Sequence, residues 1–223
     1  MPALHFEDLL QDPDRKWDGE RWGADGRPIL LLNDTADDRS AWWPVAARLA
    51  DEHAVAVLDL PVQPPIGDQA EVLAGFVAKM GTRAPVIAGH GSAALVASLF
   101  AARYVAHAVV NIEQPLNEPQ RDDDATRALQ EIIAGPRKIK CRYLAIFAAP
   151  PRPAYEAWLR ERIPDAVCAA YGTEGPFPHL SDPERFADDI RELAGLADFE
   201  GHRQALKPFD GPAVLGVEAG PSP

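Results

Sequence analysis

The stretch of the chain most suggestive of chemistry runs from residue 85 to residue 96 and reads PVIAGHGSAALV. An apolar strand leads into Gly89-His90-Gly91, and a helix of small residues begins directly afterwards. This is the pattern of a nucleophile elbow, G-x-S-x-G, in which a tight strand-to-helix turn presents a serine to the substrate. Gly91 occupies the position of that serine, and Ser92 comes one residue later. The stretch therefore predicts the turn of an acyl-transfer site without its attacking group.

Ser92 could replace the missing nucleophile only if the turn were shifted by one residue. Such a shift rotates a helical side chain by about 100° around the helix axis, so the hydroxyl would point away from the tip of the turn. We therefore expect Ser92 to cap or pack the start of the helix. A displaced nucleophile is the alternative.

Two histidines are candidates for proton transfer. His90 stands immediately before the tip of the predicted turn, and His179 lies in the segment GPFPHLSDPE at residues 175–184. Imidazole is the side chain best suited to general acid or base catalysis near neutral pH. The alternative for both histidines is a structural role in packing.

Polar residues also follow two of the predicted strands. Asn33 and Asp34 come directly after the apolar run at 28–32, and Glu113 comes after the run at 108–112. Ligands of open α/β sheets bind at the carboxyl ends of the strands. Asp34 could serve there as a general acid or base, although solvated strand-end carboxylates are the alternative for Asp34 and Glu113. The residues expected to border a ligand are Asn33, Asp34, Gly91, Ser92 and Glu113.

Short apolar runs alternate with segments of helical periodicity, which is typical of a mostly parallel sheet with helices on both faces. Trp42 and Trp43 should face the core from the first helix, and one of them could border the pocket. We expect a single α/β domain over residues 1–196 and a loop-like extension over residues 197–223. The predicted strands are residues 28–32, 54–58, 86–88, 108–112, 143–147 and 166–170, and the predicted helices are residues 41–51, 69–80, 92–103, 125–134, 155–162 and 183–193.

Composition and charge narrow the range of partners. The 223 residues include 22 Lys and Arg against 34 Asp and Glu, a formal net charge of −12. A surface this acidic repels phosphate backbones and anionic lipid, so we expect neither a nucleic-acid nor a membrane partner. Cys141 and Cys168 show no metal-ligand spacing, and we expect no metal or other cofactor. The first eight residues lack the features of a secretory signal, which favours a cytoplasmic protein.

From about residue 27 to residue 193, the order of these parts resembles the α/β-hydrolase fold, in its esterase and epoxide-hydrolase-like branch. The resemblance implies helices on both faces of the sheet and a minimal lid, because only residues 117–140 are available for the lid. It rests on five segments: LLLND at 30–34, SAWWPVAARL at 40–49, VLDLP at 57–61, AGHG at 88–91 and GPFPHLSDPE at 175–184, the last similar to the family pattern G-H-x-P-H-L-E-x-P-E.

The same resemblance implies that the hydrolytic triad is absent. Gly91 stands at the family's nucleophile position and Pro176 at the position of its catalytic histidine. No carboxylate occurs at residues 148–151, where the family's acid usually lies, although Glu113 matches the position of the acid in some members.

Two further positions depart from hydrolytic chemistry. Asp34 replaces the glycine of the family's His-Gly pair, and its charge would repel a developing oxyanion. His179 matches the family's second, non-catalytic histidine, so we expect that it could reach the pocket only if its loop were rearranged.

Three functions are compatible with these residues, and the oligomeric state stays open. The first is a non-hydrolytic homologue that binds a small apolar ligand or a protein partner. The second is a cofactor-independent lyase, isomerase or cyclase that uses Asp34, His90 or His179 as its acid or base. The third is an esterase or thioesterase with Ser92, His179 and Glu113 in displaced positions. The Ala-, Arg-, Asp- and Pro-rich composition resembles that of high-GC bacterial proteomes.

Overall fold

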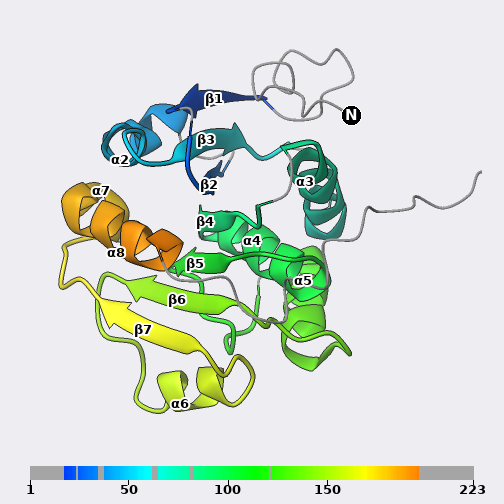
Figure 1. Cartoon of the computed structure of the whole chain (residues 1–223). Coiled ribbons are helices and arrows are strands. Elements are labelled where there is room, and N and C mark those ends of the chain that lie inside the picture. The colour runs from blue at the N-terminus through cyan, green and yellow to red at the C-terminus, as the bar shows by residue number, and fades with distance from the viewer. Residues whose placement is uncertain are drawn as a thin grey trace, which may run out of the picture.

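One seven-stranded sheet organises the chain, and all but one of its strands are parallel. The computed structural model describes residues 18–23, 25–34, 38–61, 65–80, 83–120 and 122–195. Across the sheet lie β1 (Asp18–Trp22), β3 (Ala54–Asp59), β2 (Pro28–Asn33), β4 (Val86–His90), β5 (Ala108–Ile112), β6 (Arg142–Phe147) and β7 (Ala166–Ala170), in that order (Figure 1). Only β1 runs antiparallel to its neighbour. The carboxyl ends of the other strands therefore lie along one edge.

Helices cover both faces of this sheet. One layer consists of α3 (Ile66–Met80), α4 (Ser92–Arg103), α5 (Asp123–Ala134) and α6 (Tyr155–Arg160). The other layer contains α2 (Trp43–Leu49) and α8 (Pro183–Gly195), with the one-turn α7 (Pro178–Ser181) before α8 (Figure 1). In β2, Leu30 and Leu32 face the first layer, whereas Ile29 and Leu31 face the second. Burial on both sides explains why the parallel strands are continuous apolar runs, and it confirms the predicted α/β class.

The predicted boundaries agree closely with the observed elements. The strands predicted at 108–112 and 166–170 have those bounds, and the other predicted strands are longer by one or two residues. The first predicted helix differs more, because it starts as a 3-10 helix (Arg39–Trp42) before α2. Strand β1 was not expected, since DGERW has no apolar run; its backbone pairs with the edge of β3. The extension predicted over 197–223 lies outside the described residues.

The segment in which a short lid is expected, residues 117–140, contributes α5. This helix packs beside α4 in the first layer (Figure 1). Arg103 of α4 forms ion pairs with Glu71 of α3 at 2.8 Å and with Glu131 of α5 at 2.6 Å. The backbone N–H of Ile66 donates to a carboxylate oxygen of Asp124, 2.7 Å away. These contacts tie α3, α4 and α5 together.

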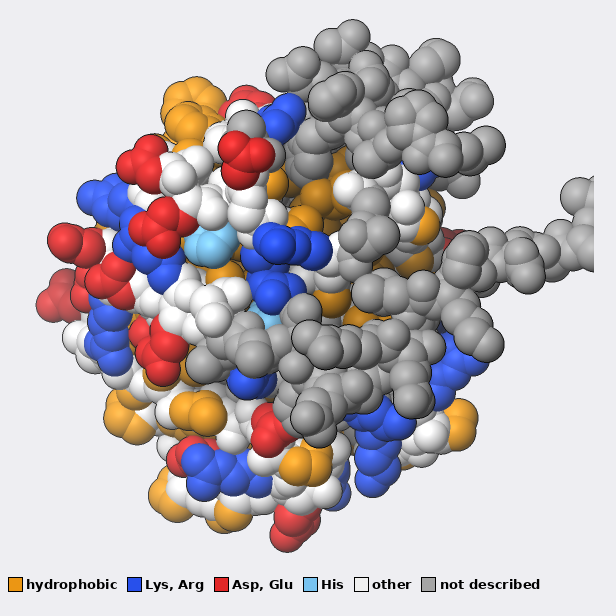
Figure 2. Space-filling view, viewed as in Figure 1, with side chains coloured by type: hydrophobic (Ala, Val, Ile, Leu, Met, Phe, Trp, Pro, Cys, Tyr) orange, Lys and Arg blue, Asp and Glu red, His pale blue; other side chains and the backbone are white. Residues whose placement is uncertain are grey.

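Acidic, basic and apolar side chains are interspersed over the described part of the face shown in Figure 2. None of the helices within the described ranges is both long enough and apolar enough to cross a bilayer.

The turn between β4 and α4 has the geometry of a nucleophile elbow. Gly91 has φ 55° and ψ −122°, a left-handed conformation that side chains make costly. Its backbone N–H donates to the carbonyl oxygen of Ile112, 3.0 Å away. Gly89 allows α4 to pack closely against the strand, because a Cβ there would lie 2.5 Å from the carbonyl carbon of Ala93. The two glycines thus have different functions, one in the bend and one in the close packing.

We expect Gly89→Ala to destabilise the protein by about 1–3 kcal/mol, the usual cost of overpacking a core. The atoms that the new methyl group meets belong to the backbone of α4, which cannot move aside as a side chain would. Chemical denaturation followed by circular dichroism measures the change in the free energy of unfolding.

The matched control is Gly75→Ala in α3, where a Cβ has no neighbour within 4 Å. There we expect a gain of about 0.5–1 kcal/mol from helix propensity. Equal effects of the two substitutions would contradict the close packing at Gly89.

Candidate functional site

The tip of the elbow offers space without a reactive group. A Cβ placed on Gly91 would meet no atom within 4 Å. The backbone therefore keeps the bend that would expose a nucleophile, and the volume in front of it is open. A hydrogen atom occupies the position from which an attacking oxygen would project.

Ser92 does not cap the helix, which was one of the two roles that we expected for it. Gly91 is the N-cap residue of α4, and Ser92 is the first residue of the helix. The exposed Ser92 hydroxyl donates instead to Oδ2 of Asp34, at 2.5 Å. The two residues meet because the parallel strands β2 and β4 are neighbours and end at the same edge. The serine is thus paired with a carboxylate rather than with an imidazole.

His90 joins the elbow to the loop that follows β7. Its Nε2 lies 2.8 Å from the carbonyl oxygen of Pro176. Because a carbonyl oxygen only accepts, Nε2 carries the proton and donates it. The His90 ring also lies against Phe177, with 4.8 Å between the ring centroids. Position 176, where the family has its catalytic histidine, thus supplies a backbone acceptor.

His179 is buried in the aromatic core beside this loop. It is 3% exposed and stacks on Trp42 at a centroid distance of 4.5 Å. Its Nδ1 has no hydrogen-bond partner among the described residues. Burial lowers the pKa of the ring to about 3, and the neighbouring His90 acts in the same direction. The imidazole is therefore neutral at physiological pH.

His179 was expected to reach the pocket at the elbow only through a rearranged loop. Its ring lies 5.5 Å from that of His90, and both line one cavity, whose described lining residues do not include Gly91. The one-turn helix α7, which the sequence pattern did not indicate, turns the His179 side chain inward.

This cavity has a volume of about 270 Å³ and lies between two segments of the chain. One wall comes from the end of β2 and from the 3-10 helix Arg39–Trp42, and the other comes from α7 and the loop before it. His90 contributes from the end of β4. No lysine or arginine is among its described lining residues. They are Asn33, Asp34, Asp38, Ser40, Ala41, Trp42, His90, Phe177, His179 and Leu180.

Some of the residues predicted from the sequence line this cavity and others do not. Asp34 and Asn33 border it, as expected, and the Asn33 amide also donates to Asp59 at 2.9 Å. Gly91, Ser92 and Glu113 are not among its described lining residues.

Glu113 is half-buried and has a left-handed backbone, with φ 57°. Its carboxylate accepts a hydrogen bond from the N–H of Ala148, which follows β6. Glu113 therefore connects the ends of two neighbouring strands.

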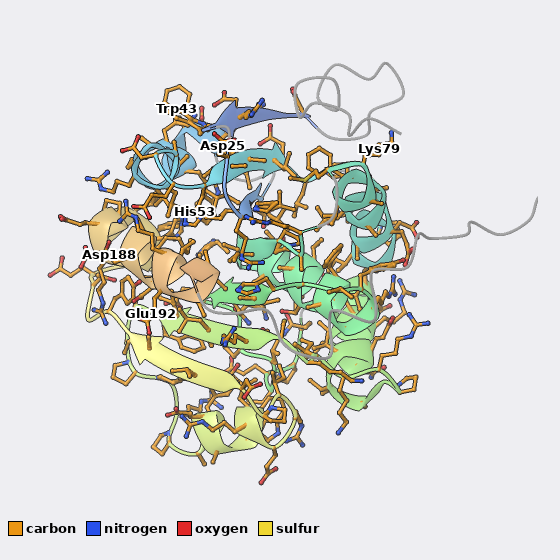
Figure 3. All side chains as sticks on the ribbon, viewed as in Figure 1. Asp25, Trp43, His53, Lys79, Asp188 and Glu192 are labelled. Carbon is orange, nitrogen blue, oxygen red and sulfur yellow. The ribbon has the colours of Figure 1, made fainter. Side chains whose placement is uncertain are left out.

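Ser40, Ala41, Phe177 and Leu180 also line the cavity and were not indicated by the sequence. Phe177 and Leu180 flank His179 in the segment 175–184, so the same motif could have indicated them. Of the two tryptophans, Trp42 is buried and lines the cavity. Trp43, predicted in the core, is 45% exposed on the outer side of α2, where its Nε1 donates to Glu20 (Figure 3). No group of three or more potential metal ligands is gathered in the part of the chain that the structure describes.

The buried imidazole predicts a specific acid sensitivity. In the unfolded chain His179 takes up a proton near its ordinary pKa of 6.5, whereas the folded chain resists protonation down to about 3. Its contribution to stability is therefore complete above pH 6.5 and declines as the pH falls toward 3. We expect His179→Phe, which preserves the stack on Trp42, to remove about 1.4 kcal/mol per pH unit from the slope of unfolding free energy below pH 6.

Denaturant titrations between pH 7 and pH 4 measure this slope. Phe186→Leu is the control, since it alters the same aromatic cluster without removing a titrating group. Identical slopes for the wild type and His179→Phe would mean that the folded ring accepts its proton normally.

Comparisons with known proteins support the fold. No family model matches the chain, and no curated protein sequence matches it. Among solved structures, Cfl2 of Burkholderia cenocepacia is 18% identical with a TM-score of 0.64, covering 80% of this chain and 92% of that one. A thermophilic esterase from Thermogutta terrifontis is 19% identical with a TM-score of 0.60, covering 79% and 92%. AqDC, which recognises and ring-cleaves the Pseudomonas quinolone signal, is 14% identical with a TM-score of 0.62, covering 81% and 97%. With the mostly parallel sheet and the elbow after β4, these similarities identify the chain as having the α/β-hydrolase fold.

Proposed function

We propose that this chain is a non-hydrolytic homologue of the α/β-hydrolases that binds a small molecule in the cavity beside the elbow. Gly91 is the observation that carries the proposal. The turn keeps the backbone angles and the open space of a nucleophile position, but no side chain projects from it. Covalent acyl transfer requires an attacking atom at this place.

The surroundings of the elbow support the same function. A hydrolase needs an imidazole bonded to its nucleophile. Here His90 donates to the Pro176 carbonyl, and the Ser92 hydroxyl donates to Asp34. His179 is neutral and buried against Trp42. In the described part of the chain, His90, His179 and the Ser92 hydroxyl therefore make contacts that differ from those of a triad.

The cavity gives this proposal its binding component. Ligand pockets combine aromatic walls with a few polar groups that orient the ligand. Trp42, Phe177 and Leu180 supply apolar wall, while Asp34 and His179 supply polar atoms. The volume of about 270 Å³ lies just below the usual range for drug-sized ligands, so the proposed ligand is small.

The absence of covalent hydrolysis is tested with a fluorophosphonate probe and with p-nitrophenyl acetate. We expect no stoichiometric labelling and no ester turnover above the rate in buffer, because nucleophile and base are both missing. Ser92→Ala is the matched control and should behave as the wild type in both assays.

Stoichiometric labelling of the wild type that disappears in Ser92→Ala would establish Ser92 as a displaced nucleophile. The non-hydrolytic function would then be wrong, and the esterase or thioesterase function would replace it.

A second function, acid–base catalysis without a covalent intermediate, is favoured by the pair of Asp34 and Ser92. Asp34 lines the cavity, and a 2.5 Å hydrogen bond joins its carboxylate to the Ser92 hydroxyl. A lyase, isomerase or cyclase requires only a positioned acid or base and a bound substrate. The similarity to AqDC, whose reaction is a ring cleavage, supports the compatibility of this fold with such chemistry.

The two functions differ in their dependence on Asp34. The ring opening of 5-nitrobenzisoxazole is catalysed by bases and therefore tests for proton transfer. Because the binding function has no proton transfer, we expect neither the wild type nor Asp34→Asn to accelerate this reaction above its rate in buffer. Absorbance of the phenolate product measures this rate.

An acceleration of about 100-fold by the wild type would favour the catalytic function. It should then be lost in Asp34→Asn and retained in Glu113→Gln, whose amide oxygen can still accept the Ala148 N–H.

A further inference from the structure

The carboxylates in the described lining of the cavity are not accompanied there by lysine or arginine. They belong to Asp34 and Asp38. The N–H of Ser40 donates to Asp38 at 2.8 Å and lowers the pKa of this carboxyl group. Asp38 is therefore ionised at neutral pH.

The guanidinium of Arg39, the residue next to Asp38, acts on Asp38 and is shared with three further carboxylates. Arg39 lies 2.5 Å from Asp59 and also pairs with Asp18 at 3.5 Å and Glu20 at 3.9 Å. These three acids belong to β1 and β3, beside the end of β2. This edge of the sheet is therefore richer in carboxylates than in cations, which attracts a positively charged ligand and repels a carboxylate or phosphate.

His179 provides an independent indication of the ligand. His179 is 3% exposed and lines the cavity. Its Nδ1 has no hydrogen-bond partner among the described residues. A buried polar atom without a partner is costly, and a ligand that supplies the missing bond recovers this cost. A neutral imidazole has one nitrogen that accepts and one that donates, so a ligand N–H can bond to the nitrogen that accepts.

The remaining wall is suited to the apolar part of such a ligand. Trp42 and Phe177 are aromatic, and Leu180 and Ala41 are aliphatic. Aromatic faces also attract cations, with Trp the most effective. The cavity thus combines carboxylates, an imidazole acceptor and aromatic surface within about 270 Å³.

We propose that the ligand of this cavity is a small organic ammonium ion, an arylalkyl amine, whose N–H groups meet Asp34, Asp38 and His179 while its ring packs on Trp42 and Phe177. This inference rests on the proposed binding function and specifies its ligand class. It also accounts for the carboxylate at position 34, where a hydrolase would avoid negative charge.

Three probes of similar size and different charge test the ligand class: phenethylamine, 3-phenylpropionate and 3-phenyl-1-propanol. Titrations followed by protein NMR or calorimetry give their affinities at low salt. We expect phenethylamine to bind at least about tenfold more tightly than the neutral alcohol, because one close charge pair contributes this much in a partly screened site. The carboxylate should show no binding, and added salt should weaken the binding of the amine.

Variants assign the effect to the cavity. Asp38→Asn and Asp34→Asn should each weaken phenethylamine binding about three- to tenfold. Glu192→Gln is the matched control, since it removes one negative charge from the exposed surface of α8 outside this cavity and should leave the affinity unchanged (Figure 3). Circular dichroism spectra verify that each variant is folded.

Equal affinity for the amine and the alcohol, tighter binding of the carboxylate, or no binding of any probe would each overturn the ammonium ligand. Insensitivity to Asp34→Asn and Asp38→Asn would overturn it as well. The fluorophosphonate and ester assays are independent of these titrations, so failure of the ligand class is distinguishable from failure of the non-hydrolytic function.

Discussion

The left-handed turn at Gly91 is the constraint on which the geometry of the site depends. In a hydrolase this conformation is costly, because it forces the side chain of the nucleophile into a strained backbone region. Glycine adopts it at little cost. The turn is held by the bond from Gly91 to Ile112 and by the close packing of Gly89 against α4. The pairing of β2 with β4 places the ends of these strands side by side, and the turn after β4 then presents Ser92 to Asp34.

The aromatic cluster around α7 depends on the same turn. His90 projects from the end of β4 and holds the loop after β7 through the Pro176 carbonyl. His179 then fills the space against Trp42 and Phe186. Both imidazoles thus contribute to the packing of the loop. A carboxylate at position 34 lies beside them in the lining of the cavity.

The sequence predicted the elements of the fold more successfully than the contacts of single side chains. Parallel strands are buried on both faces, so their apolar runs are visible without knowledge of their neighbours. Asp34 lines the cavity because the end of its strand determines its place. The contacts of Ser92 with Asp34 and of Trp43 with Glu20 were not predicted, since each partner belongs to a segment distant in the chain, the end of β2 for the serine and β1 for the tryptophan.

The amino-acid sequence by itself determined the α/β class, the positions of the buried strands and the glycine-flanked turn after β4, because these properties follow from local composition and order. The tertiary structure decided which side chains share a cavity. Strand order brought β2 beside β4, and α7 turned His179 toward Trp42. Such proximity arises from the packing of segments that lie far apart in the chain, and local periodicity contains no information about it.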